Sequence, residues 1–266
     1  MKLEGNLLKM STELNDVVQY YLNIGSEKVY MNDLIGREVQ LTYLDQIHCI
    51  RCGRKTNKSF FQGHCYPCFI NAPETAPCIV SPEKCQAHEG VARDLEWSRD
   101  HCLIDHYVYL AVSSGLKVGV TRHNQIPTRW MDQGAHEAIK LAKTPNRHLA
   151  GLIEVDLKQY MGDKTNWQQM LKNQVKNPVN LLEEKSKAAK NLVPELQKYL
   201  ISEDEITYIE YPAETYPQKV KSISFDKVKK YRGKLTGIKG QYLIFDDNSV
   251  FNIRKHNGYL GRLEVL

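Results

Sequence analysis

The sequence predicts an α+β fold in which β-rich segments at both ends enclose a cysteine-rich segment and a mixed segment. Stretches of alternating apolar and polar residues occupy the two ends, and helical patterns appear only in residues 105–200. All seven cysteines lie between Cys49 and Cys102. We therefore expect four parts: an N-terminal β segment over residues 1–48, a zinc-binding module over 49–104, a mixed domain with a helical extension over 105–200, and a C-terminal β domain over 201–266.

Length and composition are those of an ordinary globular protein. The chain has 266 residues, of which 42% are hydrophobic and 25% charged, so it has room for two or three small domains. No stretch approaches the roughly 18 consecutive apolar residues that a membrane span needs. The first residues carry Lys2 but no apolar core of a signal peptide. We expect a cytoplasmic protein without a membrane partner.

The two ends carry strand patterns. Near the N-terminus, Val39, Leu41 and Tyr43 alternate with polar neighbours, which is the period of a half-buried strand. Four strand patterns follow one another near the C-terminus, over residues 234–238, 241–246, 249–253 and 259–265. The dipeptides between them are Lys239-Gly240, Asp247-Asn248 and Asn257-Gly258. Such pairs are typical of hairpin turns, so we expect a small β meander or barrel.

The mixed domain begins with two short strands. Residues 107–111 form an apolar run, residues 113–115 have turn chemistry, and residues 116–121 make the returning strand. Pro127 suits the first turn of a helix that stops at Pro145. The apolar face of this expected helix would consist of Trp130, Ala135, Ala138, Ile139 and Ala142.

Three later segments also read as helices. Residues 149–160 fit a helical face, although Ile153, Val155 and Leu157 alternate as they would in a strand, and we expect a helix there. A second helix is expected over residues 164–174. A third is expected to begin at Pro178, with Asn177 as its N-cap.

Four of the cysteines have the spacing of a structural zinc site. Two Cys-x2-Cys pairs are separated by twelve residues, and each pair presents two thiolates about one tetrahedral edge apart. Gly53 and Gly63 supply the backbone freedom that the two turns need. The ligands of this first zinc ion are Cys49, Cys52, Cys65 and Cys68. Four protein ligands close the site, so we expect a structural role.

A second zinc site would account for the remaining cysteines. We expect Cys78, Cys85, His88 and Cys102 as its ligands, with His88 chosen because it follows Cys85 closely, although His101 and His106 lie beside Cys102. The alternative is that Cys78 and Cys102 are small buried hydrophobic residues. Seven thiolates on two zinc ions change the formal charge of +5 to about +2, so the net charge is a poor argument for nucleic acid.

An ordered set of residues in the mixed domain resembles the GIY-YIG nuclease superfamily. The set consists of Tyr107-Val108-Tyr109, Lys117-Val118-Gly119, Arg129, Glu154 and Asn166, and the resemblance covers about residues 105–167. It implies a small three-stranded sheet with helices, with the arginine on the next helix and the glutamate on a later one. Tyr107 replaces the glycine of the first motif, and Lys117 replaces the tyrosine of the second. The whole chain is also similar to a zinc-bearing prokaryotic family of unknown function.

These residues suit the hydrolysis of a phosphodiester. That reaction needs a positioned water, a group that accepts its proton, and positive charge on the phosphate. We expect Glu154 to hold a catalytic Mg²⁺, Arg129 to clamp the phosphate, and Tyr109, its pKa lowered by Lys117, to orient or deprotonate the water. His123 would be an accessory proton carrier or a surface histidine. The alternative for the four main residues is a core tyrosine with three solvated charges.

A basic cluster near the C-terminus indicates nucleic acid as the partner. The cluster consists of Lys219, Lys221, Lys227, Lys229, Lys230, Arg232, Lys234 and Lys239, and Phe225 and Tyr231 are interleaved with it. Basic side chains neutralise phosphates and aromatic faces stack on unpaired bases. We expect Lys227, Lys229, Lys230 and Arg232 to bind DNA or RNA. The alternative is a solvated charged surface.

The sequence therefore favours a metal-dependent nuclease that carries structural zinc. Two alternatives stay open: a non-catalytic zinc-containing DNA- or RNA-binding protein that retains the fold, and a protein–protein adaptor. The convergence of Tyr109, Lys117, Arg129 and Glu154 would favour the enzyme. An exposed apolar patch on the zinc module would favour the adaptor, whose protein partners the sequence does not identify.

Overall fold

The computed structural model describes residues 1–175 and 178–266, which form two compact units. The first unit consists of Met1–Ile70, Leu171–Asn173 and Ile209–Leu266, and the second consists of Asn71–Met170 and Gln174–Tyr208. The expected N-terminal β segment belongs to the first unit, as does the expected C-terminal β domain from Ile209 onward, whereas its residues 201–208 belong to the second unit. The expected zinc module is divided between the two units. The α+β fold class is confirmed.

The first unit contains a ten-stranded sheet with the order β10-β13-β12-β11-β4-β14-β1-β2-β3, in which β5 also pairs with β4. Its strands are β1 (Lys2–Glu13), β2 (Gln19–Ile24), β3 (Glu27–Tyr30), β4 (Glu38–His48), β5 (Lys55–Thr56), β10 (Lys221–Ile223), β11 (Lys230–Lys239), β12 (Tyr242–Phe245), β13 (Ser249–Asn252) and β14 (Tyr259–Val265). The expected strands at both ends of the chain are therefore present.

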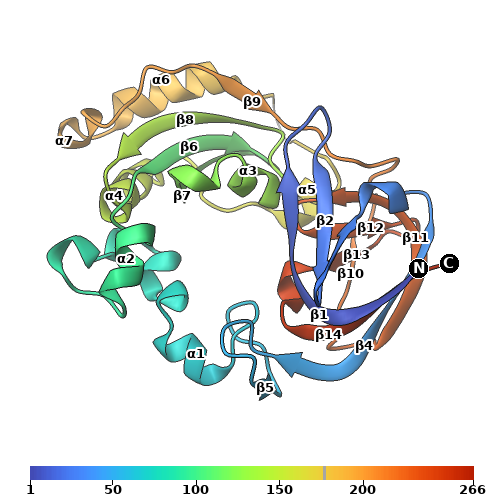
Figure 1. Cartoon of the computed structure of the whole chain (residues 1–266). Coiled ribbons are helices and arrows are strands. Elements are labelled where there is room, and N and C mark those ends of the chain that lie inside the picture. Colours follow the sequence, from blue (N-terminus) through green and yellow to red (C-terminus); the bar gives the residue numbers. More distant parts are fainter. Residues whose placement is uncertain (176–177) are drawn as a thin grey trace. The chain divides into compact units, whose positions relative to one another are not determined.

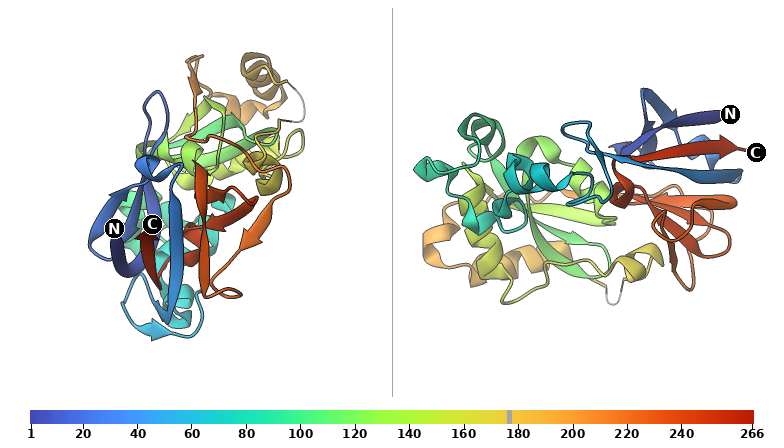
Figure 2. Two further views of the ribbon diagram at one scale, coloured as in Figure 1. Left: turned by 90° about the vertical axis from the view of Figure 1, so that its right-hand side faces the viewer. Right: turned by 90° about the horizontal axis from the view of Figure 1, so that it is seen from below.

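The centre of this sheet joins the two ends of the chain. β14 pairs antiparallel with both β4 and β1, and Lys2 lies opposite Glu264. The two termini consequently lie side by side (Figure 2). Val39 and Leu41 on β4 are almost completely buried, as their alternation predicts.

The second unit contains a four-stranded sheet with the order β7-β6-β8-β9. Its strands are β6 (His106–Val112), β7 (Leu116–Arg122), β8 (Glu137–Thr144) and β9 (Ile206–Tyr208), and its helices are α2 (Leu95–His101), α3 (Thr128–Asp132), α4 (Arg147–Leu157), α6 (Leu181–Asn191) and α7 (Pro194–Gln197). Two short helices cross the boundaries between the units: α1 (Tyr66–Asn71) and α5 (Trp167–Leu171).

One face of this sheet packs against helices to form the core of the second unit. Val108, Leu110 and Val112 of β6 contact apolar side chains of α4 and α6. Figure 1 shows α6 lying along the sheet beside β8. Because side chains alternate along a strand, Tyr109 belongs to the opposite face of β6.

Short 3-10 turns complete the secondary structure. They are Asn32–Leu34, Pro73–Thr75, Pro77–Ile79, Pro82–Lys84, Ala87–Glu89, His123–Gln125 and Arg254–His256. In the described parts of the chain, no helix is both long enough and apolar enough to span a membrane.

The expected helix from Pro127 to Pro145 is wrong. α3 ends at Asp132, and Gly134 has a φ of +67°, the left-handed conformation that terminates helices. The following residues form β8, which pairs with β6 and with β9. Ala138, Ile139 and Ala142 are all completely buried there. A strand covered on both faces has no alternating pattern, and for that reason the sequence resembled a helix.

The later helices differ in length from the expected ones. α4 confirms the helix expected over residues 149–160, and it begins after Asn146, whose side chain accepts a hydrogen bond from the Leu149 amide. The helix expected over residues 164–174 is limited to α5. α6 begins at Leu181, with Asn180 as its N-cap. The expected cap, Asn177, lies outside the described residues.

Candidate functional site

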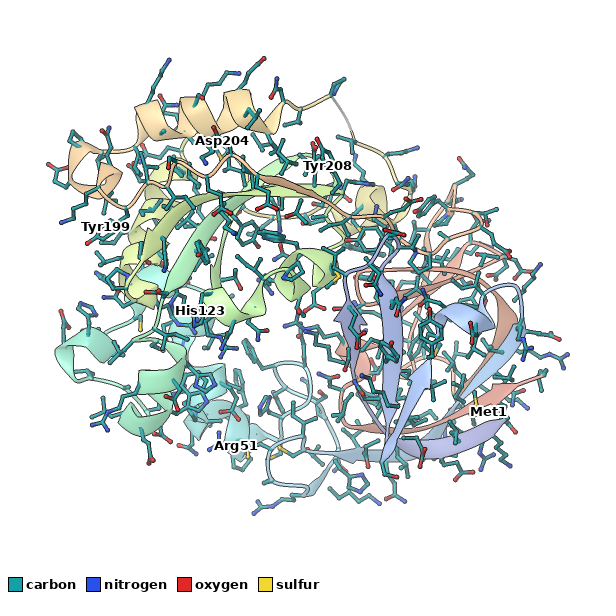
Figure 3. The ribbon with its side chains drawn as sticks, turned by 45° about the horizontal axis from the view of Figure 1, so that its top comes forward. Met1, Arg51, His123, Tyr199, Asp204 and Tyr208 are labelled. Carbon is teal, nitrogen blue, oxygen red and sulfur yellow. The ribbon has the colours of Figure 1, made fainter. Side chains whose placement is uncertain are left out.

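The first cysteine group lies in the first unit, in the loops after β4. The sulfur atoms of Cys49, Cys52, Cys65 and Cys68 all lie within 4.8 Å of one another. The turn after β4 is closed by a hydrogen bond from the Gly53 amide to the Cys49 carbonyl, 2.8 Å long, and Gly53 has a φ of +69°. Figure 3 labels Arg51 within this turn.

This geometry fits a closed zinc site. Burial alone would raise the pKa of Cys49, but backbone hydrogen bonds from Cys52, Cys65 and Arg51 lower it to about 6. A thiolate is the form that binds zinc, and four convergent thiolates complete tetrahedral coordination. The group therefore fits a structural zinc ion.

The second cysteine group lies in the second unit and contains Cys78, Cys85 and Cys102. Their sulfur atoms also lie within 4.8 Å of one another. Hydrogen bonds from the thiols of Cys78 and Cys85, together with the guanidinium of Arg147, hold the pKa of Cys102 well below its usual range. The donor set consists of soft sulfur ligands, which suit zinc.

The structure does not bring His88 into this second group. The His88 ring stacks on His148 with the centroids 4.5 Å apart, and its Nε2 lies 3.7 Å from the Glu89 carboxylate. His101 Nδ1 donates a hydrogen bond to the Trp97 carbonyl, 2.8 Å away. His106 is buried, and its Nδ1 lies 2.8 Å from the Ile104 carbonyl. The role of His88 as a zinc ligand remains a prediction.

A third cluster surrounds Tyr109 on the sheet of the second unit. Tyr109 lies directly opposite Gly119 in the pairing of β6 with β7. Its hydroxyl donates a 2.8 Å hydrogen bond to Gln133 Oε1 and accepts one from Arg129. Burial raises the pKa of Tyr109, and the charge of Arg129 opposes this rise only in part. The tyrosine is therefore protonated, and the expectation that its pKa is lowered is wrong because burial outweighs the nearby positive charge.

Lys117 is the buried lysine of this cluster. Only 3% of it is exposed, and burial, followed by the charge of Arg129, lowers its pKa to about 7. The carboxylates of Glu154 and Asp163 oppose this shift. Lys117 lies on β7 next to Gly162, whose carbonyl accepts a hydrogen bond from the Val118 amide.

Glu154 comes to the same cluster from α4. It is 8% exposed, and its carboxylate lies 3.3 Å from Lys158 Nζ, which also lies 3.2 Å from Asp163. Burial raises the pKa of Glu154, while the charge of Lys158 lowers it. Arg129 and Glu154 both act on the protonation of Tyr109 and of Lys117, so the four expected residues lie close enough to interact.

Other residues of the resemblance have local structural roles. Asn166 accepts a hydrogen bond from the Gln169 amide and so caps α5, and its own amide donates to Ser114. His123 is exposed and lies directly after β7, where Figure 3 labels it.

Sequence reasoning missed Gln133, Lys158 and Asp163. Gln133 stands four positions after Arg129, so the two share one face of a helical turn. Lys158 stands four positions after Glu154 for the same reason. The spacing of four residues from Arg129 and from Glu154 could have pointed to Gln133 and Lys158. Asp163 had none, because it reaches the cluster through a loop.

Residues 36–260 match the family model described as "Protein of unknown function (DUF2797)". The chain belongs to the DUF2797 family. The matched region contains both cysteine groups and all four residues of the Tyr109 cluster. The chain matches no curated protein and no solved structure.

The basic cluster also lies within the DUF2797 region, in the first unit. Lys227 and Lys230 are exposed, whereas Lys229 lies 2.8 Å from Asp45, and Arg232 makes a two-pronged ion pair with Glu38 at 2.6 and 2.7 Å. All four expected nucleic-acid ligands therefore belong to the surface, and two of them have carboxylate partners.

The prediction that Phe225 and Lys239 belong to an exposed nucleic-acid-binding surface is wrong. Phe225 is buried and stacks on Tyr43, with the ring centroids 5.5 Å apart. Lys239 is completely buried beside Tyr211 and Tyr216, and burial lowers its pKa to about 7. Phe225 packs among aromatic rings in the interior of this DUF2797 chain, and Lys239 is buried because β11 enters the core after Lys234.

Proposed function

We propose that this DUF2797 protein is a metal-dependent nucleic-acid phosphodiester hydrolase with a GIY-YIG-like core. The observation that carries the proposal is the electrostatic cluster formed by Tyr109, Lys117, Arg129 and Glu154. The cluster draws one residue from each of β6, β7, α3 and α4. The elements follow one another in the order β6, β7, α3, β8, α4, and this order is consistent with the small sheet that the resemblance implies.

Lys117 is the proposed general base. A base with a pKa of about 7 is substantially neutral at physiological pH, so it can take a proton from water. Tyr109 stays protonated and would position the water or a phosphate oxygen as a hydrogen-bond donor. Arg129 would clamp the phosphate with its planar fork.

Glu154 is the proposed ligand of Mg²⁺. Its carboxylate lies with Asp163 around the Lys158 ammonium, and this arrangement fits a cation that takes only one or two protein oxygens and keeps several waters. When bound, Mg²⁺ would supply Lewis acidity to the phosphate. Lys158 would then hold the carboxylate in place while Asp163 adds negative potential.

A non-catalytic nucleic-acid-binding protein is the second candidate. The exposed side chains of Lys227 and Lys230 support it, as does their position among other surface cations. The adaptor is the third candidate, and exposed apolar residues near the first cysteine group support it: Phe61 is 38% exposed, Tyr66 55% and Ile70 43%.

The test is cleavage of single- and double-stranded DNA and RNA with Mg²⁺ or Mn²⁺. Glu154→Gln keeps the size and hydrogen bonding of the side chain but removes its charge. It should abolish metal-dependent cleavage and leave folding and nucleic-acid binding nearly intact. Arg129→Lys should also impair cleavage, because a point charge does not replace a two-pronged donor. The absence of cleavage of every substrate, or cleavage that survives Glu154→Gln, would refute the enzyme.

A further inference from the structure

The second cysteine group faces a pocket that the proposed nuclease reaction does not use. The pocket has a volume of about 380 Å³, and Cys78, Cys85 and Cys102 all line it. This size lies in the range of small-molecule sites. The three cysteines therefore border a space large enough for a small ligand.

Within residues 1–175 and 178–266, three donor side chains converge at this group. In the described residues, no histidine, aspartate or glutamate places a donor atom within 4.8 Å of all three sulfurs. Zinc in proteins is almost always four-coordinate, and a site with three protein ligands takes its fourth from solution. The first cysteine group, with four sulfurs, offers no such position.

Contacts with Arg147 hold Cys102 of the second cysteine group in place. The guanidinium of Arg147 contacts Cys102, and the Arg147 amide donates a 2.8 Å hydrogen bond to the Cys102 carbonyl. Trp97 packs against Cys85 and Cys102 and lines the pocket, and its indole stacks on His101 with the ring centroids 3.9 Å apart. Cys78, Cys85 and Cys102 would hold the metal, and the pocket that they line would give a fourth ligand access to it.

We propose that zinc bound by Cys78, Cys85 and Cys102 keeps its fourth position open to this pocket and there binds the thiolate of a small thiol that also carries a carboxylate. The donor set selects the thiol, because a zinc ion with three soft ligands binds a fourth thiolate well and lowers the pKa of the incoming thiol.

The pocket walls select the rest of the ligand. Trp97 and Val91 provide apolar surface for a short carbon chain. Arg93 and Lys84 also line the pocket and provide positive charge. The Arg93 guanidinium is held by the Ala72 carbonyl at 2.8 Å and by Thr75 at 3.1 Å, so it is oriented in advance. A carboxylate at the other end of the thiol would pair with these cations.

The experiment uses the full chain loaded with Co²⁺, whose visible bands report the ligands at each metal site. Added 3-mercaptopropionate should change the bands, whereas 3-(methylthio)propionate, which has no thiol, should not. Affinity for 3-mercaptopropionate should exceed that for 2-aminoethanethiol about tenfold or more, since the second probe carries the opposite charge. Lys84→Met alters an exposed side chain and should reduce this preference.

Controls assign the response to the second group. Cys102→Ser should remove the response and leave the bands of the first group, and circular dichroism would confirm that the variant folds. If it does not fold, His88→Ala and His106→Ala decide the matter: neither should change the cobalt spectrum before thiol is added. A spectral change in either histidine variant, no response of the intact chain to 3-mercaptopropionate, or loss of cobalt to the added thiol would overturn the proposal.

Discussion

The hydroxyl of Tyr109 lies so close to Gly119 that a Cβ at position 119 would come within 2.6 Å of it. The two residues face each other on β6 and β7, and only a glycine leaves room for the ring to lie across the neighbouring strand. This contact fixes the hydroxyl beside Arg129 and Gln133. Gly119 therefore sets the position of the cluster on which the proposed reaction depends.

Gly119→Ala should displace the Tyr109 ring and disrupt its two hydrogen bonds. Overpacking of this kind costs about 1–3 kcal/mol of unfolding free energy, so the chain should still fold. Cleavage should fall by about tenfold or more, because misplaced catalytic groups lose rate steeply. The measurement is kcat on the best substrate beside a denaturation curve. Gly115→Ala is the matched control, since a Cβ there meets no atom within 4 Å; equal loss in both variants would contradict the argument.

Lys117→Met should change how stability depends on pH. Burial lowers the pKa of Lys117 to about 7, below the value of about 10.4 in an unfolded chain. Between these two values the unfolded state binds the proton and the folded state does not, so the stability of the natural protein rises with pH. We expect its urea midpoint to rise relative to that of Lys117→Met from about pH 7 to 10. The exposed Lys190→Met should show no such trend.

The same group should shape the pH profile of activity. If neutral Lys117 is the base, kcat/KM should increase as the pH rises through about 7. Lys117→Met should retain nucleic-acid binding and lose this rise together with most of the activity. A rising limb that persists in the variant would assign the base to another residue.

Zinc content should be two ions per chain, one for each cysteine group. Cys65→Ser should lose one of them and unfold the loops after β4, because structural zinc contributes on the order of 10 kcal/mol to folding. Elemental analysis and circular dichroism of the purified variants provide the measurement. Less than one zinc per natural chain would contradict both sites, and a value near one would contradict only the second.

Lys227→Glu combined with Lys230→Glu should weaken nucleic-acid binding and reduce its salt dependence. Each lost phosphate contact removes about one unit from the slope of log affinity against log salt. The pair is chosen because Lys229 and Arg232 already have carboxylate partners. Lys190→Glu with Lys198→Glu introduces the same charge change at exposed positions outside the cluster. If the slope of log affinity against log salt is unchanged in the Lys227→Glu, Lys230→Glu variant, these lysines do not contact nucleic acid and are only solvated surface residues.

Much of the fold could be predicted from local patterns, and the failures have one cause. The half-buried β4 alternates clearly, and turn dipeptides separate the C-terminal strands, so local sequence predicts these strands. The sequence of β8 resembles that of a helix because its two covered faces erase the alternation. Burial raises the pKa of Tyr109, whereas the sequence led us to expect a lowered pKa. The burial of a single residue depends on long-range packing, which the spacing of residues in the sequence does not encode.

The candidate sites were predictable where chemistry requires a fixed spacing. The first cysteine group follows from two Cys-x2-Cys pairs, and the structure brings all four sulfurs together. The three sulfurs of the second group converge as well, so this group remains compatible with the predicted second zinc ion. The position of His88 was not predictable, because a 3-10 turn directs it to His148.

β14 lies between β1 and β4 although it is the most C-terminal of the ten strands in its sheet. On the ribosome, β1 and β4 therefore emerge long before the strand that joins them. The second unit ends at Tyr208 and can fold during this interval, as protease protection of arrested nascent chains would reveal. Until Tyr259–Val265 arrives, β1 and β4 present unpaired edges to other chains. The yield of soluble protein should consequently depend on how fast the ribosome translates the residues between Tyr208 and Val265.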